Sequence, residues 1–131
     1  MSFNVQSIAV FERQAKRLVK KYASLKKELL ELVQQLKEDP RQGTPIGKSC
    51  YKIRIQITSK GKGKSGGSRV ITNLVVKYAT VYLLSIYDKT DNERITDKEL
   101  EELLQYIPVN IQKHQFYYYL HRLSLYWSLP L

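Results

Sequence analysis

The spacing of apolar residues changes once along this chain of 131 residues, at Asp39-Pro40. Before that point apolar residues recur every three or four positions, as on one face of a helix, and after it they alternate with polar residues, as on a half-buried strand. The helical part ends there because a proline pushes the residue before it out of the helical region. A chain with helices first and strands afterwards predicts an α+β domain, in which the helices are segregated from an antiparallel sheet.

Three helices and four strands follow from this pattern. The first two helices are joined by one or two residues, which predicts an antiparallel helical hairpin packed on the sheet. Ser24 is placed to cap the second helix, and the run from Thr96 to Glu99 is a capping box that opens a short C-terminal helix. The predicted elements, in chain order, are a strand over residues 3–6, a helix from residue 7, a helix over 24–39, strands over 51–58, 69–77 and 80–87, and a helix over 97–104.

Residues 108–131 follow neither period, although aromatic side chains and leucines crowd there. We therefore divide the chain into a domain over residues 1–107 and an aromatic-rich C-terminal extension over residues 108–131. The extension packs on the core or on a second copy of the chain, which would make a homo-oligomer, or it is a tail outside the functional fold.

The composition argues against several classes of protein. Cys50 is the only cysteine, so no intrachain disulfide can form and nothing indicates an oxidising compartment. No secretory signal is visible, and no stretch approaches the roughly 20 apolar residues of a membrane span. We expect a cytoplasmic protein without membrane contact.

The positive charge is concentrated in the middle of the chain. The formal net charge is +10, and every charged residue between Pro40 and Tyr87 is positive. A basic surface confined to one part of a small domain is typical of a protein that binds a polyanion, and nucleic acid is the first expectation. The cations of this acid-free stretch are Arg41, Lys48, Lys52, Arg54, Lys60, Lys62, Lys64, Arg69 and Lys77.

A glycine- and lysine-rich run over residues 60–69 joins two of the predicted strands. Gly63-Lys64-Ser65 matches the end of a nucleotide-binding phosphate loop, but Thr58 stands where the first glycine should be and a strand follows in place of a helix. The run therefore favours a cationic hairpin loop, whose glycines permit close approach to a ligand and whose cations contact phosphates. The alternative is a solvated turn.

The cations on the predicted strands suggest a chemistry. Lys52 and Arg54 point the same way from one strand, and Arg69 opens the next. With no acid nearby these cations form a patch, and their mutual repulsion lowers the pKa of a lysine among them. Such a lysine accepts a proton from a ribose 2′-hydroxyl while guanidinium groups stabilise charge on the phosphate, which is RNA cleavage without a metal. We expect no cofactor and no metal site, because no cluster of His, Cys, Asp and Glu has metal-ligand spacing.

Three segments of the sequence form a signature: Cys50–Arg54, the run Lys64–Ile71, and Leu83–Lys89. Together they resemble the RelE/ParE toxin superfamily, and most of all its RelE and HigB-like branch, over roughly residues 3–106 in order and element type. The resemblance implies a compact fold of helices on a small antiparallel sheet. It also implies a toxin of a type II toxin–antitoxin pair that cuts mRNA in the ribosomal A site without a cofactor. The implied partners are a cognate antitoxin protein, mRNA and ribosomal RNA.

The same resemblance implies roles for individual residues. Lys52 matches the family's strand lysine that is proposed as the general base, and Arg69 matches the arginine that contacts the scissile phosphate. Arg54 stands where RelE has a second lysine, and we assign it to stabilising the phosphate in the transition state. Lys89 keeps the charge of a family arginine without its bidentate fork, and Tyr87 is expected to stack on a base. The cations expected to bind RNA and the ribosome are Lys48, Lys60, Lys62, Lys64 and Lys77.

Two other functions remain open from the sequence. A ParE-like toxin has the same fold and inhibits gyrase without cutting RNA, although a protein target does not demand so many phosphate-binding groups. A non-catalytic RNA-binding module would have the same surface without the chemistry.

Overall fold

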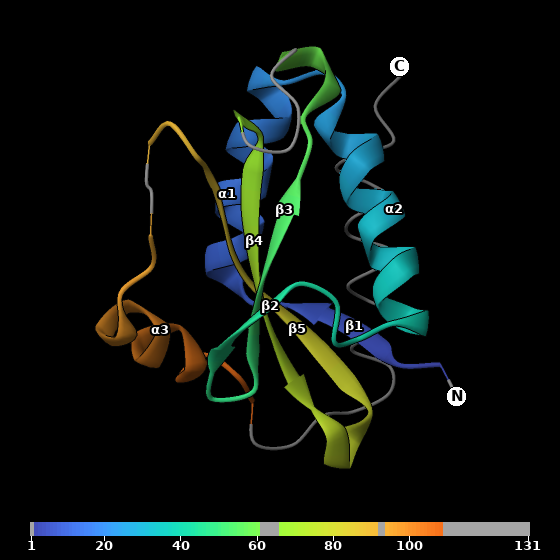
Figure 1. Ribbon diagram of the computed structural model, residues 1–131, viewed down its shortest axis with the longest axis vertical. Coiled ribbons are helices and arrows are strands. Elements are labelled where there is room, and N and C mark those ends of the chain that lie inside the picture. The colour runs from blue at the N-terminus through green and yellow to red at the C-terminus, as the bar shows by residue number, and fades with distance from the viewer. Residues whose placement is uncertain (1, 61–65, 92–93, 109–131) are drawn as a thin grey trace.

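A computed structural model describes residues 2–60, 66–91 and 94–108, which form three helices and one five-stranded sheet (Figure 1). Residues 61–65 of the lysine-rich run and nearly all of the C-terminal extension lie outside the described residues. The elements in chain order are β1 (Asn4–Ser7), α1 (Ala9–Lys21), α2 (Leu25–Glu38), β2 (Thr44–Gly47), β3 (Cys50–Ile55), the 3-10 turn η1 (Thr58–Lys60), β4 (Ser68–Val75), the 3-10 turn η3 (Val76–Tyr78), β5 (Thr80–Asp88) and α3 (Asp97–Leu104).

The sheet has the strand order β1-β5-β4-β3-β2. The α+β class predicted from the sequence is confirmed, but the sheet is mixed and not wholly antiparallel, because β1 pairs in parallel with β5. Strands β2 to β5 form the expected antiparallel ladders. The sequence pattern missed β2, whose Pro45 and Gly47 weaken a strand signal and are tolerated because β2 is an edge strand.

Helices α1 and α2 supply one side of the hydrophobic core. Their apolar stripes face the sheet as the helical spacing predicts, and on β3 the alternation buries Ile53 and Ile55 while Arg54 is exposed. The buried helix residues are Phe11, Ala15 and Leu18 of α1 and Leu25, Leu29, Leu32, Val33 and Leu36 of α2.

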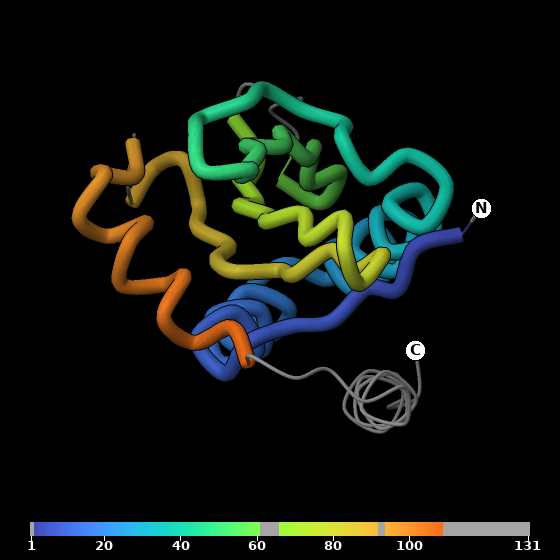
Figure 2. Tube along the Cα trace, turned by 90° about the horizontal axis from the view of Figure 1, so that it is seen from below, coloured from blue at the N-terminus to red at the C-terminus, as the bar shows by residue number. Residues whose placement is uncertain are grey.

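Helix α3 lies on the other side of the sheet from α2, as the view in Figure 2 shows. The predicted capping box is confirmed: the Thr96 hydroxyl accepts from the Glu99 backbone N–H at 3.1 Å, and the Glu99 carboxylate accepts from the Thr96 backbone N–H at 3.3 Å. Leu100 is the buried residue that anchors α3 to the core. Within the described part of the chain, no helix combines the length and the apolar composition that a membrane crossing needs.

The start of β4 explains one glycine of the signature. A Cβ added to Gly67 would lie 2.0 Å from the Ile55 carbonyl oxygen, well inside van der Waals contact. The Gly67 carbonyl also accepts a hydrogen bond from the Lys89 backbone N–H at 3.1 Å. Gly67 therefore lets the ends of β3, β4 and β5 approach closely at the edge of the site described next.

Candidate nucleic-acid site

Three neighbouring strands place Arg54, Arg69 and Tyr87 in one row across the sheet. Arg54 of β3 lies opposite Arg69 of β4, and Arg69 lies opposite Tyr87 of β5. Residues directly opposite in antiparallel strands point to the same face, with Cβ atoms roughly 4.5–5.5 Å apart. Lys52 lies two positions before Arg54 on β3 and so shares this face. We call Lys52, Arg54, Arg69 and Tyr87 the basic row.

Arg69 is the buried cation of the basic row, with 5% of its surface exposed. Its Nη1 donates to the carbonyl oxygen of Ser68 at 3.2 Å. Burial, followed by repulsion from Arg54, lowers the pKa of Arg69, while Tyr87 acts in the opposite direction. Because a guanidinium stays charged at any ordinary pH, the row presents two like charges, and an anion bound between them would relieve their repulsion.

Tyr87 brings a buried hydroxyl to the same row. The side chain is 7% exposed, and its Oη has no hydrogen-bond partner among the described residues. Burial raises the pKa of Tyr87, Arg69 lowers it and Glu99 raises it further. A buried hydroxyl without a partner costs stability. The ring also lines a cavity of about 290 Å³ between α1, β5 and α3.

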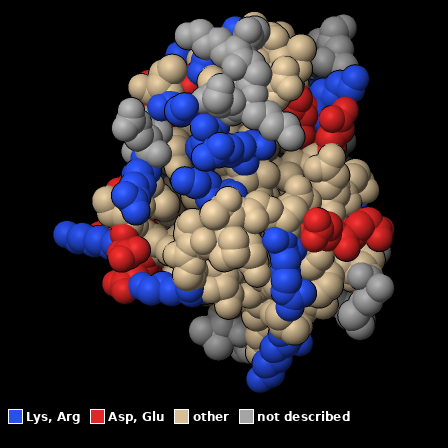
Figure 3. Space-filling view, viewed as in Figure 1, with Lys and Arg blue, Asp and Glu red and all other residues tan. Residues whose placement is uncertain are grey.

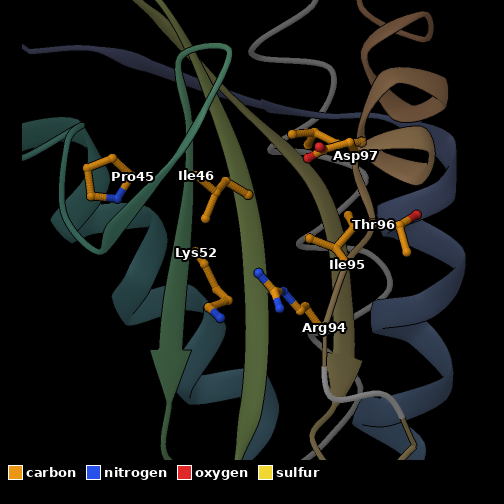
Figure 4. Close-up of a pocket in the computed structure, with 8 residues that line it drawn as sticks. Pro45, Ile46, Lys52, Arg94, Ile95, Thr96 and Asp97 are labelled. Atoms are coloured by element: carbon orange, nitrogen blue, oxygen red, sulfur yellow. The ribbon is translucent and has the colours of Figure 1, made fainter.

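A larger cleft of about 580 Å³ opens between the β2–β3 hairpin and the N-terminal end of α3. Lys52 enters it from β3, and Arg94 reaches into it from the segment before α3; Figure 4 shows their charged ends extending toward each other. The sequence pattern did not single out Arg94, because it lies beyond the acid-free stretch. Its place just before a capping box was the available signal. The lining residues are Pro45, Ile46, Lys52, Arg94, Ile95, Thr96, Asp97 and Leu100.

One ion pair spans the two walls of this cleft. The turn between β2 and β3 carries Lys48 and Ser49 at φ values of 57° and 60°, in the left-handed region. The Asn73 side-chain amide of β4 donates to the Lys48 carbonyl at 3.0 Å and so supports this turn. The ammonium group of Lys48 forms an ion pair with Glu101 of α3. An exposed ion pair thus joins the turn of the hairpin to α3 beside the cleft.

Lys60 has a different environment from the one expected for an RNA contact. Its Nζ lies 2.5 Å from Oδ1 of Asp88, and the Tyr22 hydroxyl donates to Oδ2 of Asp88 at 2.5 Å. Burial alone would raise the pKa of Asp88, but hydrogen bonds from Lys60, Tyr22 and Thr90 bring it well below its ordinary value. The charge of Lys60 is thus neutralised inside the fold, at the last described residue before the lysine-rich loop.

The remaining predicted cations lie in several places. Lys77 belongs to η3, beyond the opposite end of β4 from Arg69, with its Nζ 5.6 Å from the ring centroid of Tyr78. Lys89 follows β5 and is exposed. Lys62 and Lys64 lie outside the described residues. The structure thus brings Lys52, Arg54, Arg69 and Tyr87 together, and does not bring Lys77 to them.

The space-filling view agrees with this distribution. Figure 3 shows Lys and Arg side chains gathered over β3 and β4, with acidic side chains to either side of this area. Among the described residues, no group of three or more His, Cys, Asp and Glu side chains is arranged to hold a metal ion.

The fold and this surface together define a small α+β domain with a basic face on the sheet. The family model described as the RelE toxin of the RelE/RelB toxin–antitoxin system matches residues 8–117. The match covers most of the sequence, and the chain therefore belongs to the RelE toxin family. The matched region also extends ten residues beyond the domain boundary expected at residue 107.

A solved structure of a RelE toxin shares the fold. A mutant of the Escherichia coli toxin RelE in the free state is 18% identical, with a TM-score of 0.54, and the alignment covers 82% of this chain and all of that chain. The isolated Escherichia coli RelE toxin gives 17% identity and a TM-score of 0.48, with the same coverage of both chains. The RelBE2 toxin–antitoxin complex from Mycobacterium tuberculosis gives 14% and 0.49, covering 67% of this chain and 92% of that chain.

Proposed function

We propose that this RelE-family toxin is an endoribonuclease that cleaves mRNA in the ribosomal A site. The observation that carries the proposal is the basic row, in which Arg54, Arg69 and Tyr87 occupy directly opposite positions on three neighbouring strands. Two guanidinium groups held this close by a rigid ladder suit a phosphodiester, whose charge increases as the reaction proceeds.

The reaction is attack of a ribose 2′-hydroxyl on the adjacent phosphate. The O2′–P bond forms, the P–O5′ bond breaks, and the products carry a 2′,3′-cyclic phosphate and a 5′-hydroxyl. Lys52 takes the proton of the 2′-hydroxyl, and a proton from solvent goes to the departing 5′-oxygen. Arg54, Arg69 and Arg94 stabilise the charge on the phosphorus oxygens, a kind of contribution worth about 10²–10³-fold in rate for each donor.

The role proposed for Tyr87 differs from base stacking. Its ring is buried against the sheet, with 7% exposure, so little of its face is open to a nucleobase. The hydroxyl lacks a partner among the described residues and lies beside Arg69 in the ladder. The same burial closes off the hydroxyl, so we propose that Tyr87 acts beside Arg69 in the ladder and makes no stacking contact with a base.

A cognate antitoxin is the second partner. The family description places RelE toxins in a toxin–antitoxin system, and a chain with a net charge of +10 suits a partner with an acidic or amphipathic segment. We propose that such a segment covers the basic row and so withholds it from mRNA in the cytoplasm.

The test is a map of mRNA 5′ ends after the wild-type chain is induced in cells. Wild type should produce new 5′ ends within translated codons, whereas Arg69→Ala should produce about 10²-fold fewer. Arg17→Ala is the matched control, because it removes the same charge from an exposed position on α1. Intact messages on induction of the wild type would overturn the proposal.

A supercoiling assay with purified gyrase separates the two toxin activities. Loss of supercoiling with intact messages would identify a gyrase inhibitor. RNA binding that weakens steeply with salt, without cleavage or gyrase inhibition, would identify a non-catalytic RNA-binding module.

A further inference from the structure

A groove of about 290 Å³ lies between α1, β5 and α3, beside Tyr87 of the basic row. Its apolar walls come from Val10 of α1, Ile95 before α3, Leu103 of α3 and Tyr106 just after that helix. The first three of these wall residues are partly buried against the core, whereas Tyr106 is 56% exposed. The described residues thus leave an apolar surface open here. We call it the α3 groove.

The size and shape of the α3 groove suit the side chains of a polypeptide better than a free ligand. Its volume falls just below the range of roughly 300–1,000 Å³ that is common for small-molecule sites. The groove follows one face of α3, because the lining residues Ile95, Glu99, Glu102, Leu103 and Tyr106 recur mainly at spacings of three or four. A groove beside a helix is a usual binding place for an amphipathic segment of protein.

The chain itself supplies such a segment where the described residues end. Pro108 is the last described residue, shortly after Tyr106, and residues 109–131 follow it. Figure 2 shows the end of α3 beside α1, where the groove lies. An extended chain advances about 3.3 Å per residue, so a few residues are enough to return to the groove. A tethered segment also acts at a high effective concentration, so that any other occupant must displace it.

Charge favours the same occupant. The extension carries the cations Lys113 and Arg122 and has no Asp or Glu. The Glu99 carboxylate is engaged in the capping box, and Glu101 pairs with the turn between β2 and β3. Glu102 is the exposed carboxylate that remains at the groove. An acidic rim around an apolar groove complements a cationic segment rich in aromatic side chains and leucines.

We propose that residues 109–131 dock in the α3 groove of the same chain and hold α3 against the sheet. Leu100 is the one residue of α3 that is buried, so this short helix gains from a second apolar contact. The docked extension covers the side of Tyr87 that lines the groove. Through α3 it also supports the wall of the neighbouring cleft that carries Arg94. This docking does not depend on the RNA cleavage proposed above.

The fluorescence of Trp127 in the purified full-length protein tests the docking. Trp127 is the only tryptophan in the sequence, so its emission reports on the extension alone. In the wild type the emission maximum should lie to the blue of that of free tryptophan, and acrylamide should quench it weakly. Tyr106→Ala should shift the emission to the red and strengthen the quenching. Tyr78→Ala removes an exposed ring from η3 and is the matched control, with emission as in the wild type.

A charge reversal tests the acidic rim separately. Glu102→Lys should shift the emission of Trp127 to the red, because it repels the cations of the extension, and added salt should reduce this effect. Glu38→Lys makes the same change at an exposed position of α2 and should leave the emission unchanged. A lysine near the C-terminal end of α3 suits the helix dipole. Faster hydrogen exchange of the α3 amides in Glu102→Lys would therefore come from loss of the docked extension.

Two kinds of result would overturn the docking. Emission from a water-exposed Trp127 in the wild type would leave the groove to a segment of another protein, and emission unchanged in both groove variants would place the extension elsewhere. A red shift on dilution, with dimers in sedimentation, would place the extension on a second copy of the chain. Buried emission that is independent of protein concentration in a monomer, and lost in both groove variants, would support docking within one chain.

Discussion

Arg54 and Arg69 lie directly opposite each other in the antiparallel β3–β4 ladder. Like charges at such a pair of positions destabilise a sheet, and Arg69 is buried while Arg54 is exposed. We expect the repulsion within this pair to cost stability, and a bound phosphate would offset that repulsion. The free energy of unfolding of the unliganded chain therefore gives a measurable test of how the charges on this face are arranged.

Replacing Arg54 by glutamine should raise the free energy of unfolding at low salt, by roughly 0.2–1 kcal/mol. The gain is expected at the small end of this range, because solvent screens an exposed guanidinium. Urea unfolding at low and high NaCl measures it, and the gain should shrink as salt increases. Arg17→Gln on α1 is the control for a general loss of charge. A variant less stable than wild type at low salt would contradict this reading of the pair.

Replacing Asp88 by asparagine should destabilise the fold by about 3–5 kcal/mol at neutral pH, because it leaves the ammonium of Lys60 buried without its partner. The pKa of Asp88 is lowered in the folded state from an ordinary value of 3.8. A carboxyl of this kind contributes its full stability above the unfolded pKa and loses it as the pH falls through the folded pKa. The difference between wild type and variant should therefore be constant near neutrality and narrow below about pH 4.

Denaturant unfolding between neutral and acidic pH checks this dependence on Asp88. Asp91→Asn, an exposed carboxylate three residues further on, is the matched control and should change stability little. A difference between wild type and Asp88→Asn that stays the same at every pH would show that the ion pair is not its source.

Replacing Gly67 by alanine should destabilise the chain by roughly 1–3 kcal/mol or more, because the new Cβ would collide with the Ile55 carbonyl. Gly47→Ala is the comparison: its φ of +93° disfavours alanine, but no atom lies within 4 Å of the added Cβ. Thermal unfolding should therefore give a larger fall in Tm for Gly67→Ala. Equal falls in Tm would indicate that position 67 needs glycine for its backbone conformation and not for the close approach of the strands.

Replacing Arg94 by alanine should lower cleavage by about 10²-fold, because it removes one of the cations of the cleft to which we assign the phosphate. Lys77→Ala should change cleavage far less, since η3 follows the opposite end of β4 from Arg69. The 5′-end map, normalised to protein level, measures both. A stronger effect of Lys77 than of Arg94 would move the RNA-binding surface away from the cleft.

The alternation of apolar and charged residues on β3 was sufficient to place Lys52 and Arg54 on one face, since the period of a strand decides the direction of its side chains. The helical stripes of α1 and α2 and the capping box of α3 were also predicted, because they depend on neighbours three or four positions apart. The sequence pattern missed the edge strand β2. Pro45 and Gly47 weaken its strand signal, although β2 pairs with β3 in the structure.

The sequence by itself determined the α+β class, the basic character of the middle third and the local direction of the strand cations. All of these follow from residues close together in the chain. Only the tertiary structure decided which charges meet. Strand register placed Arg69 between Arg54 and Tyr87, folding brought Lys60 to Asp88, and the return of the chain after β5 brought Arg94 to Lys52. These contacts join residues far apart in the chain, and the packing that creates them depends on the whole core.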